Sequence, residues 1–286
     1  METKIRIALQ KKGRLNDDSM KLLKEAGIKF NVGSGKLVAS SPNFPIEVLF
    51  LRDDDIPQTV ADKVADIGIV GENEMLEKGF DLNISKRLGF SRCRLSLAIP
   101  KADEYKGLDY FEGKKVATSY PVILKKYFAE QKINADIHEI TGSVEIAPGI
   151  GLADGICDIV SSGSTLVANR LKEVDVVMES EALLVAAPEL SAEKQALLDE
   201  IIFRINSVKA ANSNKYILMN VPNDKVNDIL EILPGMKSPT VLPLADDKWS
   251  SVHSVIQEKK FWEIIGQLRN KGAEGILVIP IEKMIL

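Results

Sequence analysis

Short apolar segments alternate with segments of helical periodicity along the first 160 residues, and this rhythm constrains the fold most. We predict strands at 4–9, 46–51, 66–71, 114–119, 136–140 and 156–160. Between them, the spacing of apolar residues predicts helices at 17–27, 56–65, 121–131 and 146–155. Strands that alternate with helices are typical of α/β proteins with mainly parallel sheets.

The alternation also repeats along the chain. With a shift of 92 residues, ADKVADIGIVG at 61–71 aligns with ADGICDIVSSG at 153–163, and Asp66 meets Asp158. Such internal similarity indicates two lobes of like construction, although chance similarity between α/β sequences is the alternative. Two lobes of this kind would form a cleft, where ligands usually bind.

The pattern changes after a helix predicted at 192–211 and a polar linker at 212–215. The elements predicted next are a strand at 216–222, a helix at 223–233, strands at 239–244 and 250–256, a helix at 259–272 and a strand at 275–281. This βαββαβ order is typical of the ferredoxin-like unit.

Composition excludes several function classes. Lys plus Arg is 37 and Asp plus Glu is 41, a net charge of −4, which argues against a general nucleic-acid binder. The two cysteines, Cys93 and Cys157, form neither a disulfide framework nor a zinc spacing, and two histidines are too few for a multi-histidine metal site. No secretory signal is recognisable, and apolar runs such as 182–188 are too short to cross a bilayer. We therefore expect a cytoplasmic protein without nucleic-acid or membrane partners.

One stretch carries the chemistry of an anion site. The predicted strand ICDIV runs directly into Ser161, Ser162, Gly163, Ser164 and Thr165. Small residues let backbone N–H groups approach an anion, hydroxyls add donors, and a helix predicted from Leu166 adds partial positive charge. A Ser/Gly-rich turn that caps a helix is the alternative, and the spacing of a nucleoside-triphosphatase loop is absent.

Three acidic residues precede this loop. Glu145, Asp154 and Asp158 could accept hydrogen bonds from the hydroxyls of a sugar phosphate, or could hold Mg²⁺. Asp158 lies within an apolar strand, where a buried carboxylate needs a partner, so a functional role is favoured. For Asp154, an exposed position at a helix end is an equal alternative.

These residues resemble the signature of the ATP phosphoribosyltransferase family, the first enzyme of histidine biosynthesis: a Glu, then G-L-A-D-x-I-x-D, then [ST]-G-x-T-L. Its elements stand here as Glu145, residues 151–154, Ile156, Asp158 and residues 162–166. Further matching segments lie at 8–15, 52–57, 66–73, 93–98, 117–121, 238–244 and 280–284. The resemblance spans essentially the whole chain and points to the long form of the enzyme.

The resemblance implies a fold and an activity. The expected fold is α/β, with a two-lobed periplasmic-binding-protein-like catalytic core and a C-terminal ferredoxin-like (ACT-like) βαββαβ domain. Lobe I would comprise 1–97 and 180–211, lobe II with the phosphate loop 98–179, and a regulatory histidine-binding domain 214–286. The family transfers phosphoribosyl from 5-phosphoribosyl 1-pyrophosphate to N1 of ATP, with Mg²⁺ and release of pyrophosphate. Histidine inhibits enzymes of this family, and the resemblance implies a homo-oligomer, from dimer to hexamer.

Candidate site residues follow from position and from the resemblance. Lys11, Lys12, Arg14 and Arg52 follow the first two predicted strands, at the ends where α/β sheets bind ligands. Solvated loop charge is the alternative for these cations. We assign catalytic roles to Lys11, Arg14 and Arg52, much less to Lys12, and also to the carboxylate of Asp158. Phosphoribosyl pyrophosphate is assigned to Glu145, Asp154, Asp158, Ser161, Ser162, Gly163, Ser164, Thr165 and Leu166, and the metal to Glu145 and Asp158. ATP is assigned to Arg14, Leu15, Gly71, Glu72, Asn73, Thr118, Ser119 and Tyr120.

The C-terminal domain supplies a second expected site. Histidine is assigned by resemblance to Asn220, Met236, Thr240 and Gly275; the family often carries Asp near Asn220, which puts contact with a ligand ammonium in doubt. His253 is interpreted as a packing residue, and Arg92 and Arg94 as ion-pair or ligand residues. Two other functions remain open: a two-lobed small-molecule sensor and a catalytically inactive regulatory paralogue.

Overall fold

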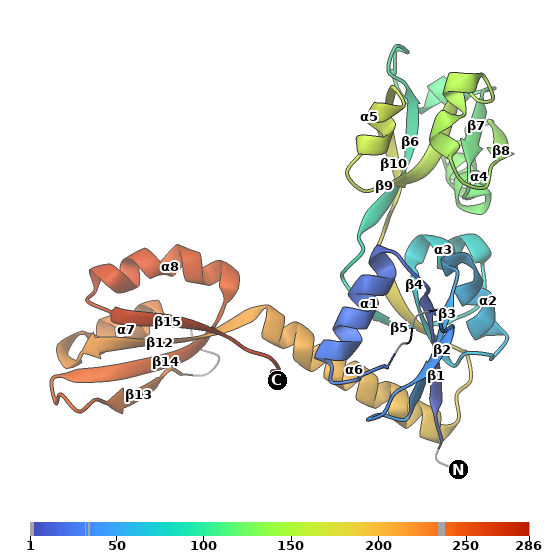
Figure 1. The fold of residues 1–286 in the computed structure, drawn as a ribbon. Coiled ribbons are helices and arrows are strands. Elements are labelled where there is room, and N and C mark those ends of the chain that lie inside the picture. Colours follow the sequence, from blue (N-terminus) through green and yellow to red (C-terminus); the bar gives the residue numbers. More distant parts are fainter. Residues whose placement is uncertain (1–2, 32, 34, 234–237, 286) are drawn as a thin grey trace. The chain divides into compact units, whose positions relative to one another are not determined.

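The computed structural model describes residues 3–31, 33, 35–233 and 238–285. Two compact units result, Met1–Lys21 with Ile28–Leu198, and Leu22–Gly27 with Asp199–Leu286. The first unit contains a six-stranded and a five-stranded sheet, and the second a four-stranded sheet (Figure 1). Within the described ranges, no helix has the length and apolar character needed to cross a membrane.

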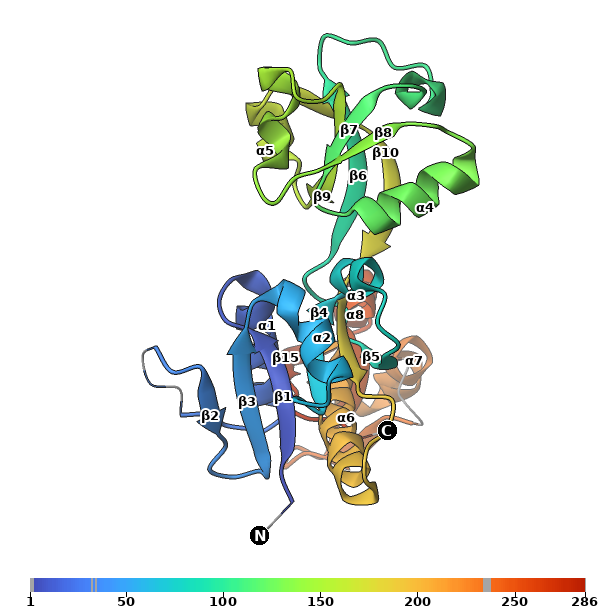
Figure 2. The same ribbon diagram turned by 90° about the vertical axis from the view of Figure 1, so that its right-hand side faces the viewer.

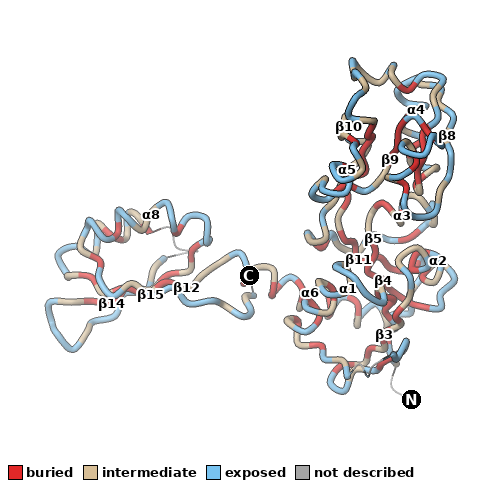
Figure 3. The backbone as a smooth tube through the Cα atoms, turned by 45° about the horizontal axis from the view of Figure 1, so that its top comes forward, coloured by how far each residue is buried: buried red, intermediate tan, exposed pale blue. Residues whose placement is uncertain are grey.

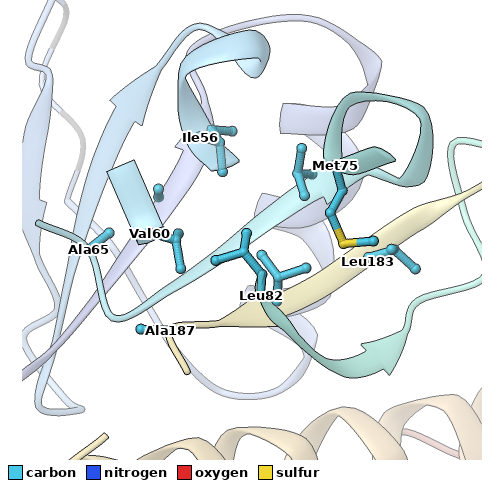
Figure 4. Close-up of a cluster of buried hydrophobic side chains, with 10 residues drawn as sticks. Ile56, Val60, Ala65, Met75, Leu82, Leu183 and Ala187 are labelled. Carbon is cyan, nitrogen blue, oxygen red and sulfur yellow. The ribbon is translucent and has the colours of Figure 1, made fainter. Parts of the chain in front are cut away.

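The six-stranded sheet has the order β2-β3-β1-β4-β11-β5. Its strands are β1 (Ile5–Gln10), β2 (Val38–Ser40), β3 (Ile46–Leu51), β4 (Ile67–Gly71), β5 (Asn83–Arg87) and β11 (Ala182–Ala186), and its helices are α1 (Arg14–Glu25), α2 (Ile56–Ala61) and α3 (Glu72–Lys78). Ile56 and Val60 of α2 pack on Ala8 and Leu183 in a buried cluster (Figure 4). Since β4 and β11 are almost entirely buried (Figure 3), they read as continuous apolar runs.

The five-stranded sheet has the order β10-β6-β9-β7-β8. Its elements are β6 (Cys93–Pro100), β7 (Lys115–Thr118), β8 (Asp136–Glu139), β9 (Gly155–Val160), β10 (Leu171–Ser180), α4 (Pro121–Gln131) and α5 (Ser164–Ala168). Helix α4 packs on Leu95 and Leu97, whereas α5 packs on Ala98 and Ile156. Alternate residues of a strand face opposite sides, so the two helices cover opposite faces (Figure 2).

Apart from the additional edge strand β2, the two sheets share one topology. Strands β3, β1 and β4 are parallel; β11 is antiparallel to β4, and β5 is antiparallel to β11. Strands β8, β7 and β9 are likewise parallel; β6 is antiparallel to β9, and β10 is antiparallel to β6. The strands aligned by the sequence repeat, β4 and β9, occupy the same place in this order. The internal similarity therefore reflects a duplicated architecture.

The helix predicted at 146–155 is wrong. The chain there forms two short 3₁₀ turns, Val144–Ile146 and Pro148–Ile150, and then enters β9 at Gly155. Pro148 cannot donate a helical hydrogen bond, and Gly151 adopts a left-handed φ of 75°, so an α-helix does not propagate.

The second unit contains the predicted βαββαβ order. Helix α6 (Ala192–Asn212) leads to β12 (Asn214–Pro222), α7 (Val226–Ile232), β13 (Thr240–Pro243), β14 (Trp249–Gln257), α8 (Glu258–Asn270) and β15 (Glu274–Pro280). The antiparallel sheet has the order β13-β14-β12-β15. Ile217 and Met219 of β12 pack on Ile229 of α7 and on Phe261 and Leu268 of α8, which forms this unit's own core.

Candidate active site

The loop after β9 borders a pocket of about 190 Å³. Its lining residues come from the 3₁₀ turn before β9, from β9 itself, and from the loop and helix α5 that follow: Glu145, Asp158, Ile159, Val160, Ser161, Ser162, Gly163, Thr165 and Leu166. Both predicted metal-binding carboxylates, Glu145 and Asp158, therefore face the same space as the predicted phosphate loop. Ser164 is not among the lining residues, but its hydroxyl lies 3.0 Å from that of Ser162.

Gly163 shapes this loop. Its φ of 79° lies in the left-handed region, which residues with a Cβ rarely adopt. The turn allows the Ser164 N–H to reach the Ser162 hydroxyl at 3.4 Å, and the Val167 N–H to reach the Gly163 carbonyl at 3.2 Å. Helix α5 that follows has only five residues, so the loop itself, rather than a long helix dipole, would supply the donors for an anion.

Asp158 lies in an environment that disfavours its charge. Burial raises the pKa of Asp158, and the nearby carboxylate of Glu145 raises it further. The Ile159 N–H, which donates to Asp158 Oδ1 at 2.8 Å, opposes the rise. Two carboxyl groups that repel each other at one pocket gain from a bound cation or from hydroxyl donors.

The donor set fits Mg²⁺ only as a shared site. No group of three or more His, Cys, Asp and Glu side chains suited to a metal occurs among the residues that the structure describes. Mg²⁺ commonly binds through one or two carboxylates and completes its octahedron with waters and substrate phosphates. Glu145 and Asp158 match that pattern.

The three predicted catalytic cations lie after β1 and β3. Arg14, the first residue of α1, donates from Nη1 to Ser161 Oγ at 3.0 Å and so contacts the phosphate loop. Lys11 follows β1 and is exposed, as is Lys12. Arg52 follows β3 and pairs with Asp54 at 3.0 Å, so it must exchange this partner to contact a ligand.

Asp154 lies away from this pocket. It precedes β9, whereas the loop follows β9, so a six-residue strand separates the two. Its carboxylate accepts the Lys115 N–H at 2.9 Å, and its own N–H donates to the Lys115 carbonyl at 2.8 Å. These bonds join the starts of β7 and β9, so its observed contacts are structural.

Two residues predicted to bind ATP, Asn73 and Tyr120, contact each other. Asn73 Nδ2 donates to the Tyr120 hydroxyl at 3.2 Å, and that hydroxyl donates to Glu74 at 2.8 Å. Asn73 Oδ1 accepts from Ser180 Oγ at 2.8 Å. Asn73 and Tyr120 are both buried, and burial together with Glu74 raises the pKa of Tyr120. Sequence reasoning missed Glu74 and Ser180, because their partners lie far along the chain.

Most of the other residues predicted to bind ATP are hydrogen-bonded within the protein. Thr118 Oγ1 accepts the Tyr120 N–H at 2.9 Å, and Ser119 Oγ donates to Ile140 O at 2.6 Å. Glu72 forms two bonds with Arg87, at 2.5 and 2.7 Å. A Cβ at Gly71 would lie 2.6 Å from Asn73 Oδ1, so a larger residue here would displace the amide oxygen that accepts from Ser180. Leu15 is half-buried beside Arg14.

The residues predicted to bind histidine are only partly brought together. Asn220 of β12 lies beside Gly275 of β15, where a Cβ would lie 3.5 Å from Asn220 Nδ2. Thr240 begins β13, which β14 separates from β12, and it is exposed. Met236 lies outside the described residues. His253 is hydrogen-bonded at both ring nitrogens, to Tyr216 at 2.7 Å and Ser251 at 2.8 Å, consistent with its interpretation as a packing residue.

Comparison with known proteins decides the family. Residues 52–207 match ATP phosphoribosyltransferase, and residues 211–283 match the HisG C-terminal domain. The chain belongs to the ATP phosphoribosyltransferase family. It is 64% identical over 282 residues to ATP phosphoribosyltransferases of Parabacteroides distasonis and Bacteroides thetaiotaomicron, covering 99% of this chain and 100% of each relative. The similarity includes the C-terminal domain, as the long form requires.

A solved structure agrees with the family assignment. The ATP phosphoribosyl transferase (HisG:HisZ) complex from Thermotoga maritima matches with a TM-score of 0.60 and 28% identity, over 71% of this chain and 98% of that chain. The predicted resemblance, the α/β fold class and the transferase class are thus confirmed. The chain is an enzyme of the histidine-biosynthetic family that its signature indicated.

Proposed function

We propose that this cytoplasmic enzyme transfers the phosphoribosyl group of 5-phosphoribosyl 1-pyrophosphate to N1 of ATP, and that histidine inhibits it. One observation carries the proposal beyond the family assignment. Glu145 and Asp158 line the same pocket as the hydroxyl-rich loop 161–165. A sugar phosphate needs both kinds of group side by side: donors for its phosphate and acceptors for its hydroxyls.

In this reaction the lone pair of adenine N1 forms a bond to ribose C1, and the C1–O bond breaks with its electron pair leaving on pyrophosphate. No enzyme nucleophile is required, so the protein's contribution is positioning and electrostatic stabilisation. The loop would hold the 5′-phosphate through its hydroxyls and backbone N–H groups. Glu145 and Asp158 would accept from the ribose hydroxyls and favour positive charge that develops at C1.

Cations complete the site. Mg²⁺, held by Glu145 and Asp158 together with the substrate, would supply positive charge that favours departure of the pyrophosphate. Lys11, Arg14 and Arg52 would contact the pyrophosphate from the strand ends where they lie. Arg14 is the best supported of the three, because it already reaches Ser161 of the loop.

For ATP we propose contacts with Arg14, Leu15, Gly71 and Glu72, of which Glu72 must first exchange the exposed Arg87 side chain that it now pairs with. The polar groups of Asn73, Thr118, Ser119 and Tyr120 are occupied by protein partners, so we propose that these residues shape and hold the site rather than bind the nucleotide. Their replacement should then affect stability as well as the KM for ATP.

We further propose a division of labour along the chain. Lobe I comprises 1–97 and 180–211, lobe II 98–179, and the regulatory domain 214–286. Histidine would bind near Asn220 and Gly275, which the structure places side by side, with Thr240 and Met236 as further contacts. Inhibition from this domain needs two states of the protein with different histidine affinity. The family's homo-oligomers, dimer to hexamer, would provide such states.

The decisive experiment is a spectroscopic assay with ATP, phosphoribosyl pyrophosphate and Mg²⁺, since substitution at N1 changes adenine absorbance. Added pyrophosphatase removes the inhibiting product. Asp158→Asn should reduce turnover by about a hundredfold or more, because its charge is lost next to the reacting sugar. Asp136→Asn, on the exposed part of β8, is the matched control. Normal turnover by Asp158→Asn would remove that residue from the mechanism.

Two further outcomes are informative. Turnover that histidine does not suppress would leave the C-terminal domain without its proposed role. No turnover by the unmodified chain, with pyrophosphatase present, would favour an inactive regulatory paralogue or a small-molecule sensor.

A further inference from the structure

A side-chain cluster beside the phosphate loop is not explained by the site described above. Arg94 of β6 donates from Nε and from Nη2 to the two carboxylate oxygens of Glu173 on β10, both at 2.5 Å. Ser96, which is fully buried, donates its hydroxyl to the same carboxylate at 2.7 Å. The guanidinium lowers the pKa of Glu173, so this carboxylate stays ionised and holds Arg94 in one orientation.

The cluster is fixed next to the end of β9. In the antiparallel pairing of β6 with β9, Arg94 is the partner of Val160 and Ser96 is the partner of Asp158. Paired residues of adjacent strands point to the same face of a sheet. Arg94 and Ser96 therefore lie on the face that carries Asp158 and the pocket, one strand away from it.

The remaining guanidinium nitrogen connects the cluster to the loop. Arg94 Nη1 donates to the backbone carbonyl of Ser161 at 3.4 Å. Ser161 also receives Arg14 on its hydroxyl, so the first residue of the loop is held at its side chain and at its backbone. Because a trans peptide is planar, the Ser161 C=O and the Ser162 N–H point in opposite directions. Holding the carbonyl on Arg94 therefore fixes the direction of the Ser162 N–H.

We propose that Arg94 is a positioning residue for the phosphate loop, with Glu173 as the counter-ion that orients it. The proposal rests on the proposed function, and it gives Arg94 an indirect role. Arg94 holds the Ser161 peptide so that the Ser162 N–H is directed at the phosphate of the sugar substrate. Glu173 occupies two of the guanidinium donors and thereby keeps Arg94 on the protein rather than on the ligand.

This role predicts a selective kinetic effect. Arg94→Met retains much of the side-chain length but removes the donors and the charge. Its KM for phosphoribosyl pyrophosphate should rise about tenfold, as expected when one charge-assisted contact to the loop is lost, while the KM for ATP stays within about twofold. Arg94→Lys should recover only part of the loss, because an ammonium cannot reproduce the fork of donors. Glu173→Gln should behave like Arg94→Lys.

A matched control and a second readout separate positioning from general damage. Arg92→Met removes an arginine two residues away on the same segment, where the side chain is 76% exposed and pairs with Glu181 only at 3.8 Å. It should leave both KM values unchanged. Binding of inorganic pyrophosphate and of phosphate to each full-length variant is measured by calorimetry, and folding by far-UV circular dichroism.

The outcomes distinguish the two proposals. If the unmodified chain turns over and Arg94→Met keeps its KM for phosphoribosyl pyrophosphate, the positioning role is overturned and the function stands. If Arg94→Met raises both KM values equally and lowers the unfolding temperature, Arg94 is only structural. If the unmodified chain neither turns over nor binds the sugar pyrophosphate, the proposed function fails and takes the inference with it.

Discussion

Helix α4 takes its N-terminal cap from another helix, and removing that cap is the sharpest test of the contacts between α3 and α4. The N-cap residue Tyr120 offers no side-chain hydrogen bond to the helix. Instead, the carboxylate of Glu77 on α3 accepts the Val122 N–H at 2.9 Å and the Ile123 N–H at 3.0 Å. One carboxylate thus satisfies two of the free N–H groups of the first turn and interacts with its positive end.

The expected loss can be worked out from these two bonds. Removing an N-terminal cap destabilises a helix by about 1 kcal/mol, and loss of a charge at the helix end adds a further ~1 kcal/mol in a partly buried position. Glu77→Ala should therefore weaken the first turn of α4 by about 2 kcal/mol. Glu77→Gln keeps an acceptor but no charge and should lose about half of that.

Amide hydrogen exchange, followed by mass spectrometry, reads this loss locally. A loss of about 2 kcal/mol corresponds to roughly thirtyfold faster exchange at Val122 and Ile123. Trp249 and Trp262 are the only tryptophans and both lie in the second unit, so their fluorescence during urea unfolding should stay unchanged as an internal control. Unchanged exchange in Glu77→Ala would refute the capping role, and uniformly faster exchange would mean global destabilisation.

Three further predictions follow from burial and backbone geometry. Burial raises the pKa of Glu74, so folding favours its protonated form, and the unfolding free energy should fall as the pH rises through the raised pKa. Glu74→Gln should therefore flatten the dependence of unfolding free energy on pH and be more stable than the unmodified chain at pH ~7. Burial also raises the pKa of the Cys157 thiol, so a thiol reagent should modify it only when urea unfolds the chain, and modification in the native state would contradict that burial. Gly275→Ala places a methyl group beside Asn220 at a left-handed φ of 58°. The change should weaken histidine inhibition and lower the unfolding free energy by about 1 kcal/mol. Inhibition equal to that of the unmodified chain would remove Gly275 from the regulatory site.

The sequence predicted what depends on local pattern. Strand 66–71 is recognisable because both of its faces are buried, which makes it almost continuously apolar, and strand 156–160 because apolar residues flank its single carboxylate, Asp158. The loop at 161–165 was recognisable because small and hydroxyl-bearing residues follow a buried strand directly. The helix expected at 146–155 failed for a local reason as well, since Pro148 and the left-handed Gly151 override the apolar spacing.

Features that depend on distant pairs were not predictable in the same way. Along the chain, Asp154 and Asp158 are four residues apart and look like one acidic site. In an extended strand those residues lie about 13 Å apart, and Asp154 faces the start of β7 instead. Glu77 of α3 and Val122 of α4, whose N–H it accepts, are 45 residues apart in the sequence, so nothing in the local pattern indicates the cap.

Arg94 illustrates how the same residue type takes different roles at one site. The sequence leaves it open as an ion-pair residue or a ligand residue. In the structure it is both bound by a carboxylate and directed at the loop, whereas Arg14 reaches the loop without a carboxylate partner among the described contacts. A guanidinium already neutralised by Glu173 contributes little net charge to a phosphate, but it can hold a peptide in place. Of these two arginines, Arg14 must then supply the charge to the ligand, and comparing the salt dependence of phosphate binding in Arg14→Met and Arg94→Met tests this division. The salt dependence should weaken only in the Arg14 variant; an equal weakening in both would show that Arg94 acts on the ligand directly.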